Sequence, residues 1–537
     1  MIGTFTNKCY NKKITCDLQQ YFAINNVTMA VSDKEPLLFD PPAYKRSNSM
    51  SSMSPNAILK SFVLMSICFS ANHGAVTACL GLSSVTTDLT FLGADLGTYQ
   101  SGCLYLFYTA SAVFGGECTK IRSPNSATTL THNTNHHHHH HHYHPPRVAA
   151  YIVKKVGPRN GLLYGLIIYC VYVACFLVAA VIPDSHDAWK WPVALLGAAI
   201  GGVGGGFLWT AQGAYFGKTA EAYAIAKNIP TSEATSSLGG IFAFFYLAEE
   251  VMLKMLSTLL TKVFDYDWTV VFAFYTAIAV SGAIGMGFCH SFRVEDDEES
   301  KPLCTKLFSA VRILVNDSKM KYMIPMNAVF GFSAAFLTSY VTGQVVHLQK
   351  NGDDYAGALT AIPAGVAAIF SIIFGQVAKV TGKGPVLITG ACTFGLMTSL
   401  FVVNPDTASW GWTSIFVIYS LMGVGRATFE GTLRATFADF FANDKEGAFA
   451  NIILQSGLSS ALGFLGFPHI LCKEESDYCV RYKDDTLHNV LAMEIICIGT
   501  AVLAVVGYSI AAVQHKQQKK REENAFGPPS GKLVESV

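Results

Sequence analysis

Charge is scarce in this chain of 537 residues: Asp, Glu, Lys and Arg make up 14% of it, against about 25% in a typical soluble domain. Apolar residues supply 51% of the chain. Too few charged side chains are present to cover the surface of a water-soluble protein of this length. The composition therefore excludes an ordinary soluble protein and indicates an integral membrane protein.

Motifs of enzymes and of nucleic-acid binding are lacking as well. The sequence has no phosphate-binding loop, no nucleophile arrangement and no cluster of metal ligands at fixed spacing. We therefore expect no enzymatic activity, no cofactor, no bound metal and no nucleic-acid partner. The partner that the composition does predict is the lipid bilayer.

Apolar stretches long enough to cross that bilayer recur along the chain. A spanning helix needs about 17–25 mostly apolar residues, because unpaired backbone groups in hydrocarbon cost several kcal/mol each. The fifth stretch is the least typical, since it contains Glu249, Glu250 and Lys254. The twelve stretches begin near Ala57, Leu96, Gly161, Trp191, Ser237, Trp268, Met320, Ala356, Pro385, Gly411, Gly447 and Leu487.

Lys and Arg gather before the first stretch, after the last one and in every second loop between them. By the positive-inside rule, both termini are expected in the cytosol. Residues 1–56 show no cleavable signal-peptide pattern, so insertion is expected to rely on the first stretch itself. We expect a location in the plasma membrane or in an endosomal or vacuolar membrane.

The two halves of the chain repeat each other. "KKVGPRNGLLYG" (154–165) parallels "AKVTGKGPVLITG" (378–390), and "GVGGGFLWTAQGAYF" (202–216) parallels "GVGRATFEGTLRATF" (423–437). The segment 118–147, which contains "HHHHHHHYH", has no counterpart in the second half. A histidine run without fixed spacing cannot impose a tetrahedral metal site. We interpret this segment as a disordered, neutral insertion in a loop, or as unspliced coding sequence.

These patterns predict an all-α polytopic membrane protein with 12 transmembrane helices in two pseudo-symmetric bundles of six. The expected bundles are residues 57–290 and 320–513. A cytosolic loop at 291–319 joins them. A disordered tail (1–56) precedes them and a basic tail (514–537) follows.

The loops after the second and eighth spans sit where the major facilitator superfamily carries a Gly-x-x-x-Asp-Arg-x-Gly-Arg motif, and both copies lack the Asp. More narrowly, "LGTYQSGCLYLFYTASAVFG", "FLWTAQGAYF" and "GVGRATFEGTLRATFADFFANDKEGAFANIILQSGLSSALGF" resemble the uncoordinated-93-like family. In the superfamily the Asp helps lock the outward-open state, so its loss puts ordinary rocker-switch gating in question. The gating-loop candidates are Lys154, Lys155, Gly157, Arg159, Lys379 and Gly382.

The resemblance implies the major facilitator fold and a role in ion homeostasis, ion channel regulation or trafficking of membrane partners, such as a channel or a receptor. It implies no known substrate and no catalytic residues. The alternative is a secondary active transporter that moves a small solute or ion by alternating access.

Ionisable residues inside the spans are the next candidates, because they are costly in lipid and usually face the bundle interior. Arg426, Glu430 and Arg434 are spaced four apart on one helix face, a spacing that allows two salt bridges at once. This triad is either a structural clamp or part of a substrate site. Glu249 or Glu250 could bind a proton or a cation, or Glu250 could pair with Lys254.

Uncharged polar and aromatic residues complete the candidates for a cavity. Trp209, Gln212 and Tyr215 follow a run of glycines at 201–206, which indicates either close helix packing or local unwinding. His73 and Asn327 could line the same cavity or form ordinary hydrogen bonds between helices.

Two short signals lie in the amino-terminal tail. "DKEPLL", with Asp33, Leu37 and Leu38, resembles the acidic dileucine signal that clathrin adaptors bind. "PPAY", with Pro41, Pro42 and Tyr44, resembles the ligand of WW domains, which often belong to ubiquitin ligases. In the predicted non-cytosolic loop, Cys472 and Cys479 could form a disulfide or remain two free thiols.

Overall fold

The computed structural model describes residues 53–83, 93–114, 157–229, 231–291, 311–346, 349, 352–441, 445–470 and 490–526. All of these residues belong to one compact unit, Met53–Val537. Several predicted features lie outside the described residues: the signals at 33–44, the histidine segment, Lys154 and Lys155, most of the central loop, and the Cys472–Cys479 pair.

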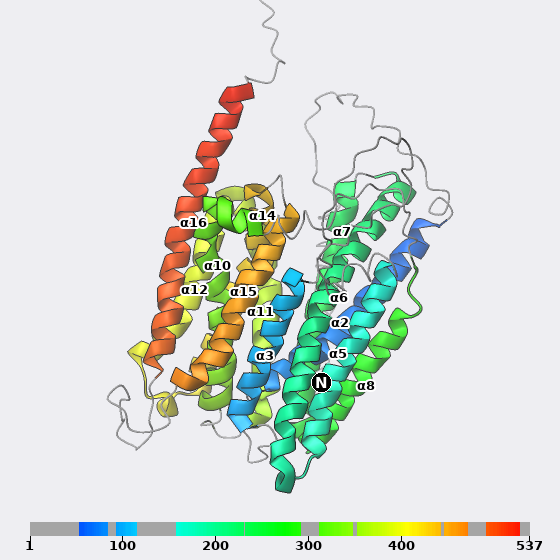
Figure 1. Ribbon diagram of the computed structural model, residues 1–537, viewed down its shortest axis with the longest axis vertical. Coiled ribbons are helices and arrows are strands. Elements are labelled where there is room, and N and C mark those ends of the chain that lie inside the picture. The colour runs from blue at the N-terminus through cyan, green and yellow to red at the C-terminus, as the bar shows by residue number, and fades with distance from the viewer. Residues whose placement is uncertain are drawn as a thin grey trace, which may run out of the picture. The chain divides into compact units, whose positions relative to one another are not determined.

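Every regular element in the described residues is a helix (Figure 1). The first half consists of α2 (Pro55–Leu82), α3 (Gly93–Phe114), α5 (Pro158–Val181), α6 (Lys190–Lys227), α7 (Thr231–Thr258) with its π-helical end η2 (Leu259–Val263), and α8 (Trp268–Met286), besides a short 3-10 segment, η1 (Asp184–Trp189).

The second half begins with α10 (Ser318–Ala335) and its π-helical continuation η3 (Phe336–Val345). It continues with α11 (Gly352–Thr381), α12 (Lys383–Val403), η4 (Thr407–Ser409), α13 (Trp412–Ala427), the π-helix η5 (Thr428–Leu433), α14 (Arg434–Phe440), α15 (Lys445–Ile470) and α16 (Leu491–Phe526). The run α13–η5–α14 is one interrupted span.

Ten of the described helices are long and apolar enough to cross a membrane. The other two predicted spans correspond to α3 and to the interrupted run α13–η5–α14. The helices begin within a few residues of the predicted starts, and the largest shift is at α7, which begins at Thr231 rather than Ser237.

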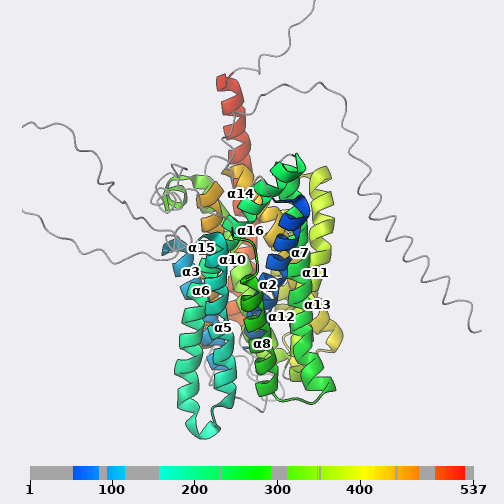
Figure 2. The same cartoon turned by 90° about the vertical axis from the view of Figure 1, so that its right-hand side faces the viewer.

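The packing repeats between the halves. In the first half α2 contacts α7 and α8, α5 contacts α6 and α8, and α3 contacts α6. In the second half the equivalent helices make the equivalent contacts: α10 with α15 and α16, α12 with α13 and α16, and α11 with α13. The halves meet through α3 with α15 and through α7 with α11, which lie side by side in Figure 2. The repeat also relates these two contacts, because α3 corresponds to α11 and α15 corresponds to α7.

The glycines of α6 serve close packing, not local unwinding. α6 is an unbroken helix, and a Cβ on Gly201 would lie 2.7 Å from the ring of Tyr172 on α5. A Cβ on Gly202 would collide with the backbone of α3 at Leu104. Small residues at helix contacts let backbones approach closely in lipid, where no hydrophobic effect drives association.

Two glycines of the repeated loop share an unusual backbone conformation. Gly157 precedes α5 with φ 85°, and Gly382 precedes α12 with φ 81°. This region of φ and ψ is essentially restricted to glycine and costs other residues about 1–3 kcal/mol. The equivalent turns of the two halves therefore depend on the same residue type for the same reason.

We predict that Gly382→Ala lowers the free energy of unfolding by about 1–3 kcal/mol through backbone strain alone, because no atom of the described residues lies within 4 Å of the added Cβ. Gly375→Ala is the matched control: it lies inside α11, also has open space around its Cβ, and should be neutral or stabilising by about 0.5–1 kcal/mol. SDS titration of the purified protein in mixed micelles measures both. Equal effects of the two changes would contradict the strain argument.

Candidate functional site: an ion cluster between the two halves

One face of α7 carries a ridge of four residues spaced four apart: Phe242, Tyr246, Glu250 and Lys254. Residues at this spacing lie one above another on a helix, so the ridge runs from aromatic to charged. The Glu250 side chain is 2% exposed and accepts a hydrogen bond from Lys254 Nζ at 2.8 Å. The pairing that we considered for Glu250 and Lys254 is thus present in the structure.

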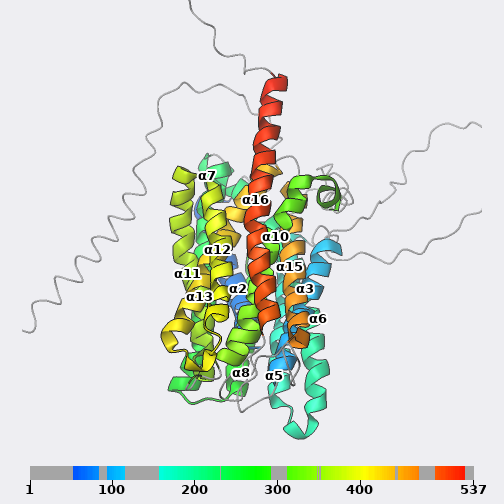
Figure 3. The same cartoon turned by 90° about the vertical axis from the view of Figure 1, so that its left-hand side faces the viewer.

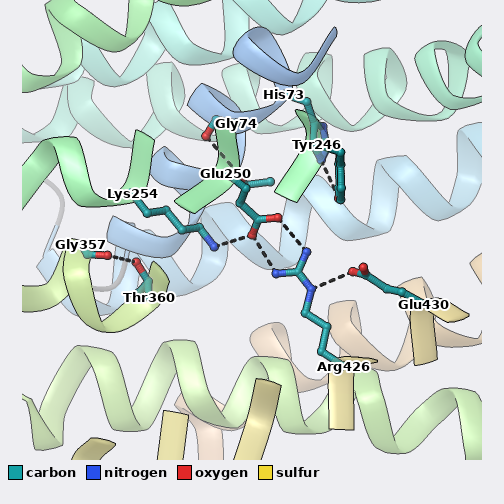
Figure 4. A network of polar contacts seen from close by, with 10 residues as sticks. His73, Gly74, Tyr246, Glu250, Lys254, Gly357, Thr360, Arg426 and Glu430 are labelled. Atoms are coloured by element: carbon teal, nitrogen blue, oxygen red, sulfur yellow. Dashed lines mark hydrogen bonds and ion pairs between the residues drawn. The ribbon is translucent and has the colours of Figure 1, made fainter. Parts of the chain in front are cut away.

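Arg426 reaches Glu250 from the other half of the chain. Its Nη1 and Nη2 atoms donate to the two carboxylate oxygens of Glu250, each at 2.8 Å (Figure 4). This is the bidentate arrangement in which a planar guanidinium matches a carboxylate. A buried ion pair therefore joins α7 to α13 across the boundary between the two halves.

The third donor of the guanidinium is also used. Arg426 Nε donates to Glu430 Oε1 at 2.7 Å, and the Glu430 side chain is 26% exposed. We name Glu250, Lys254, Arg426 and Glu430 the inter-half ion cluster. Glu430 is its most accessible member.

The triad of Arg426, Glu430 and Arg434 contains one of the two ion pairs that its spacing allows. Within the described part of the chain, Glu430 and Arg434 form no ion pair, and Arg434 is exposed. Arg434 begins α14 directly after η5, and its side chain is exposed. Of the two pairs that the spacing allows, the described residues show the one between Arg426 and Glu430.

The inter-half ion cluster is neutral as a whole, because it holds two cations and two carboxylates. Placing charges in a low-dielectric interior is expensive, and removing one partner of a buried pair costs about 3–5 kcal/mol because the other charge remains uncompensated. Each of the three guanidinium nitrogens of Arg426 donates a hydrogen bond within the cluster, and both Glu250 oxygens accept one. The cluster is therefore stable only while the two halves stay together.

The halves also approach closely from the cluster toward η2. A Cβ on Gly357 of α11 would collide with Ser257 and with the backbone of Lys254 on α7. The Ala358 backbone N–H donates to Thr258 Oγ1 at 2.9 Å, and Lys262 pairs with Asp354 at 2.9 Å. The α7–α11 contact is thus continuous from the buried ion pair to an exposed one.

An aromatic cluster lies beside the charges on the first half. The His73 ring contacts Trp209 and Tyr246 at centroid distances of 5.3 and 5.5 Å, and it stacks on Phe69 at 5.7 Å. Tyr246 Oη and His73 Nε2 lie 3.4 Å apart, while His73 Nδ1 is buried without a hydrogen-bond partner among the described residues. His73 and Trp209 are therefore brought next to the inter-half ion cluster.

Other predicted cavity residues lie elsewhere. Tyr215 is fully buried and donates to the His290 carbonyl at 3.2 Å, where α6 meets the end of α8. Asn327 donates to Gln455 Oε1 at 2.6 Å, an ordinary bond between α10 and α15. Gln212 is buried in α6, and Glu249 is half-buried on α7.

The repeated loops are partly described. Arg159 donates to the Gly287 carbonyl at the end of α8. Lys383, next to Gly382, pairs with Asp439 of α14 at 2.6 Å. Lys379 lies in the last turn of α11. In the described residues no group of three His, Cys, Asp or Glu side chains is placed to hold a metal ion.

Sequence reasoning missed Tyr246 and Phe242, and it missed the pairing of Glu250 with Arg426. The spacing of four along 242, 246, 250 and 254 is a signal that could have found the first two residues. The ion pair had no local signal, because its partners are 176 residues apart in the chain.

With this geometry established, comparison with known proteins identifies the class. The family model of the Major Facilitator Superfamily matches residues 148–467. The fold resembles a mutant form of the nucleoside transporter NupG, with a TM-score of 0.57 and 11% identity over 85% of this chain and 99% of that one. It also resembles a D-xylose–proton symporter, with a TM-score of 0.55 and 13% identity over 84% and 97%. The chain belongs to the Major Facilitator Superfamily.

Within that superfamily the chain is UNC93-like, and it is a transporter-like multi-pass membrane protein. It is 27% identical to protein unc-93 homolog A of Bos taurus over 179 residues, which are 33% of this chain and 38% of the relative. It is 21% identical to UNC93-like protein 3 of Arabidopsis thaliana over 340 residues, 60% and 70% of the two chains. The chain spans 38%, 49% and 42% of the bovine, mouse and human relatives that it matches.

We predict that Glu250→Gln and Arg426→Gln each lower the free energy of unfolding by about 3–5 kcal/mol, since each leaves a buried charge unbalanced. The double variant restores neutrality and should lose clearly less than the sum of the two single changes. SDS titration in mixed micelles measures this cycle.

Lys262→Gln with Asp354→Asn provides the control, because that pair also joins the two halves but its side chains are 32% and 41% exposed. It should change stability by about 1 kcal/mol or less. If the losses at Glu250 and Arg426 simply add, the two side chains are not coupled and the inter-half ion cluster has no energetic role.

Proposed function

We propose that this protein is a transporter-like regulator of the UNC93-like type, which acts in ion homeostasis, ion channel regulation or trafficking of a membrane partner. The observation that carries this proposal is the Glu250–Arg426 ion pair inside a neutral, buried cluster between the halves. Its relatives are named unc-93 homologs, which agrees with such a role.

A carrier that works by alternating access separates its halves in every cycle. Separating the halves here breaks the ion pair between Arg426 and Glu250. This costs about 3–5 kcal/mol of free energy unless the other state offers equally good partners. An energy gap of that size keeps the other state below about 1% of the population. A regulator needs only one arrangement of its helices to present to a partner, so the inter-half ion cluster suits that role.

A specific observation favours a second candidate, a secondary active transporter. Glu430 is 26% exposed, so a solute can approach the cluster. An anionic group that replaced Glu250 on the Arg426 guanidinium would free the two halves without leaving the cation unpaired. Glu249, half-buried one residue away, would then be a candidate for proton or cation coupling.

The proposed topology has both termini in the cytosol, at a plasma, endosomal or vacuolar membrane. Under this topology the tail signals at 33–44 face cytosolic proteins, and we propose a clathrin adaptor and a WW-domain ligase as partners. The support for these partners is the sequence of the two signals.

For the regulator we predict that proteoliposomes with the full chain accumulate neither potassium nor any solute of a small-anion and neutral panel above empty liposomes. Spin labels at Ser237 on α7 and Val380 on α11, both exposed and on opposite halves, should give a single distance population that the panel leaves unchanged. Glu250→Gln with Arg426→Gln should broaden that distribution. A membrane-protein partner should co-purify in stoichiometric amount from native membranes.

The regulator proposal is overturned by saturable uptake that is lost in Glu250→Gln and kept in the variant Lys262→Gln with Asp354→Asn, together with a second, solute-dependent distance. That result would establish the carrier.

We further predict that Leu37→Ala with Leu38→Ala raises the fraction of the protein at the cell surface, because adaptor binding requires both leucines. Surface biotinylation measures this fraction. The control Ile24→Ala with Val27→Ala removes two apolar residues of the same tail outside the signal and should have no effect. If both variants behave alike, the dileucine assignment is wrong.

A further inference from the structure

A second polar site lies far from the inter-half ion cluster, where α16 leaves the apolar span. A pocket of about 540 Å³ opens between the helical turns at 311–316, the start of α10 and the extension of α16. Its size is within the range of small-ligand pockets, which is about 300–1,000 Å³. The lining residues are Arg312, Ile313, Asn316, Asp317, Ser318, Lys319, Gln514, Gln517, Gln518 and Arg521.

The lining is cationic and rich in hydrogen-bond donors. It has three cations, Arg312, Lys319 and Arg521, against one carboxylate, Asp317. That carboxylate is already engaged, since Asp317 Oδ1 accepts the Lys319 backbone N–H at 2.8 Å as the N-cap of α10. The amides of the glutamines and the Ser318 hydroxyl add neutral polar groups.

The floor of the pocket is fixed by bonds between α10 and α16. Lys319 is 6% exposed, and its Nζ donates to Gln518 Oε1 at 2.6 Å and to the Phe440 carbonyl at 2.9 Å. Ser318 Oγ donates to Gln514 Oε1 at 2.9 Å. The Lys319 ammonium also lies 3.7 Å from Asp317 Oδ2, so its charge is partly balanced, and the excess positive charge of the lining comes from Arg312 and Arg521 at the exposed rim.

The position of the pocket relative to the lipid-facing surface indicates what occupies it. α16 carries exposed apolar side chains up to Val513, and every residue from Gln514 to Asn524 is polar or charged. Val311 and Val315, 45% and 58% exposed, lie next to the pocket. Figure 3 shows α16 running beside α10 and continuing past its end. The pocket therefore begins at the level where acyl chains end and headgroups begin.

We propose that this pocket binds the phosphate-bearing headgroup of an anionic membrane lipid, whose acyl chains lie along the exposed apolar face of α16. Guanidinium groups bind phosphate oxygens in a bidentate manner, and basic pockets at the cytosolic edge of membrane proteins accommodate such headgroups. The same phosphate chemistry also exists in soluble inositol phosphates, so the experiment separates the two sources.

The test uses the detergent-purified full chain, titrated with dioctanoyl phosphatidylinositol 4,5-bisphosphate, dioctanoyl phosphatidylserine, dioctanoyl phosphatidylcholine and soluble inositol 1,4,5-trisphosphate, with binding followed by native mass spectrometry. The anionic lipids should bind, phosphatidylcholine should not, and the soluble headgroup should bind more weakly than its lipid. Arg312→Gln with Arg521→Gln should weaken lipid binding by about tenfold or more, since each cation near an anionic headgroup contributes roughly a factor of five.

Lys516→Gln with Lys520→Gln is the matched control: it removes the same charge from the same region but none from the pocket lining, and should weaken binding by less than about threefold. Gln517→Glu, an exposed change that adds a negative charge to the lining, should weaken binding as the arginine variant does. Equal losses in the control and the arginine variant, or equal binding of phosphatidylcholine, would overturn the proposal. Equal affinity for soluble inositol trisphosphate and its lipid would overturn the lipid as the source of the phosphate.

Discussion

The rest of the structure depends on the bidentate ion pair between Glu250 and Arg426. Within each half, helices pack through small residues and aromatic rings. These contacts are apolar, so they do not depend on how far apart the two halves lie. A buried carboxylate and guanidinium are different, because neither can be left alone in a low-dielectric interior. The bidentate pair holds α7 against α13, and α7 also contacts α11 closely at Gly357.

Solvent exposure determines how much each ion pair between the halves contributes to the stability of the protein. Glu250 and Arg426 are 2% and 11% exposed, whereas Lys262 and Asp354, which join α7 to α11 a few turns away, are 32% and 41% exposed. Water screens the second pair and solvates its members when they part, so it adds little to stability. Water cannot solvate the members of the buried pair in this way when they separate. The strong constraint between the halves is therefore at Glu250 in the α7 ridge and not at the exposed Lys262 beyond it.

Much of the fold could be predicted from the sequence because each spanning helix is a local pattern, and the repeat shows itself in aligned glycines such as Gly157 and Gly382. The Glu250–Lys254 pair was accessible for the same reason, since spacing of four places both on one helix face. Two features could not be predicted, because they do not depend on a local pattern in the sequence. The exposure of Arg434, which leaves Glu430 paired with Arg426 alone, cannot be read from residue spacing, and the partner of Arg426 depends on which helices of opposite halves meet. Tertiary contact, not propensity, determines the candidate site.

The proposed lipid pocket lies where the last helices of the two halves differ in length. By the repeat, α8 and α2 correspond to α16 and α10. α8 ends at Met286, and the chain then turns back so that the His290 backbone N–H donates to Ser61 Oγ at 2.8 Å, which ties this end of the first half to α2. α16 instead continues to Phe526 and supplies a second wall beside α10. A duplicated bundle thus keeps its helix contacts in both halves, while an extended last helix gives the second half a cationic pocket beside α10.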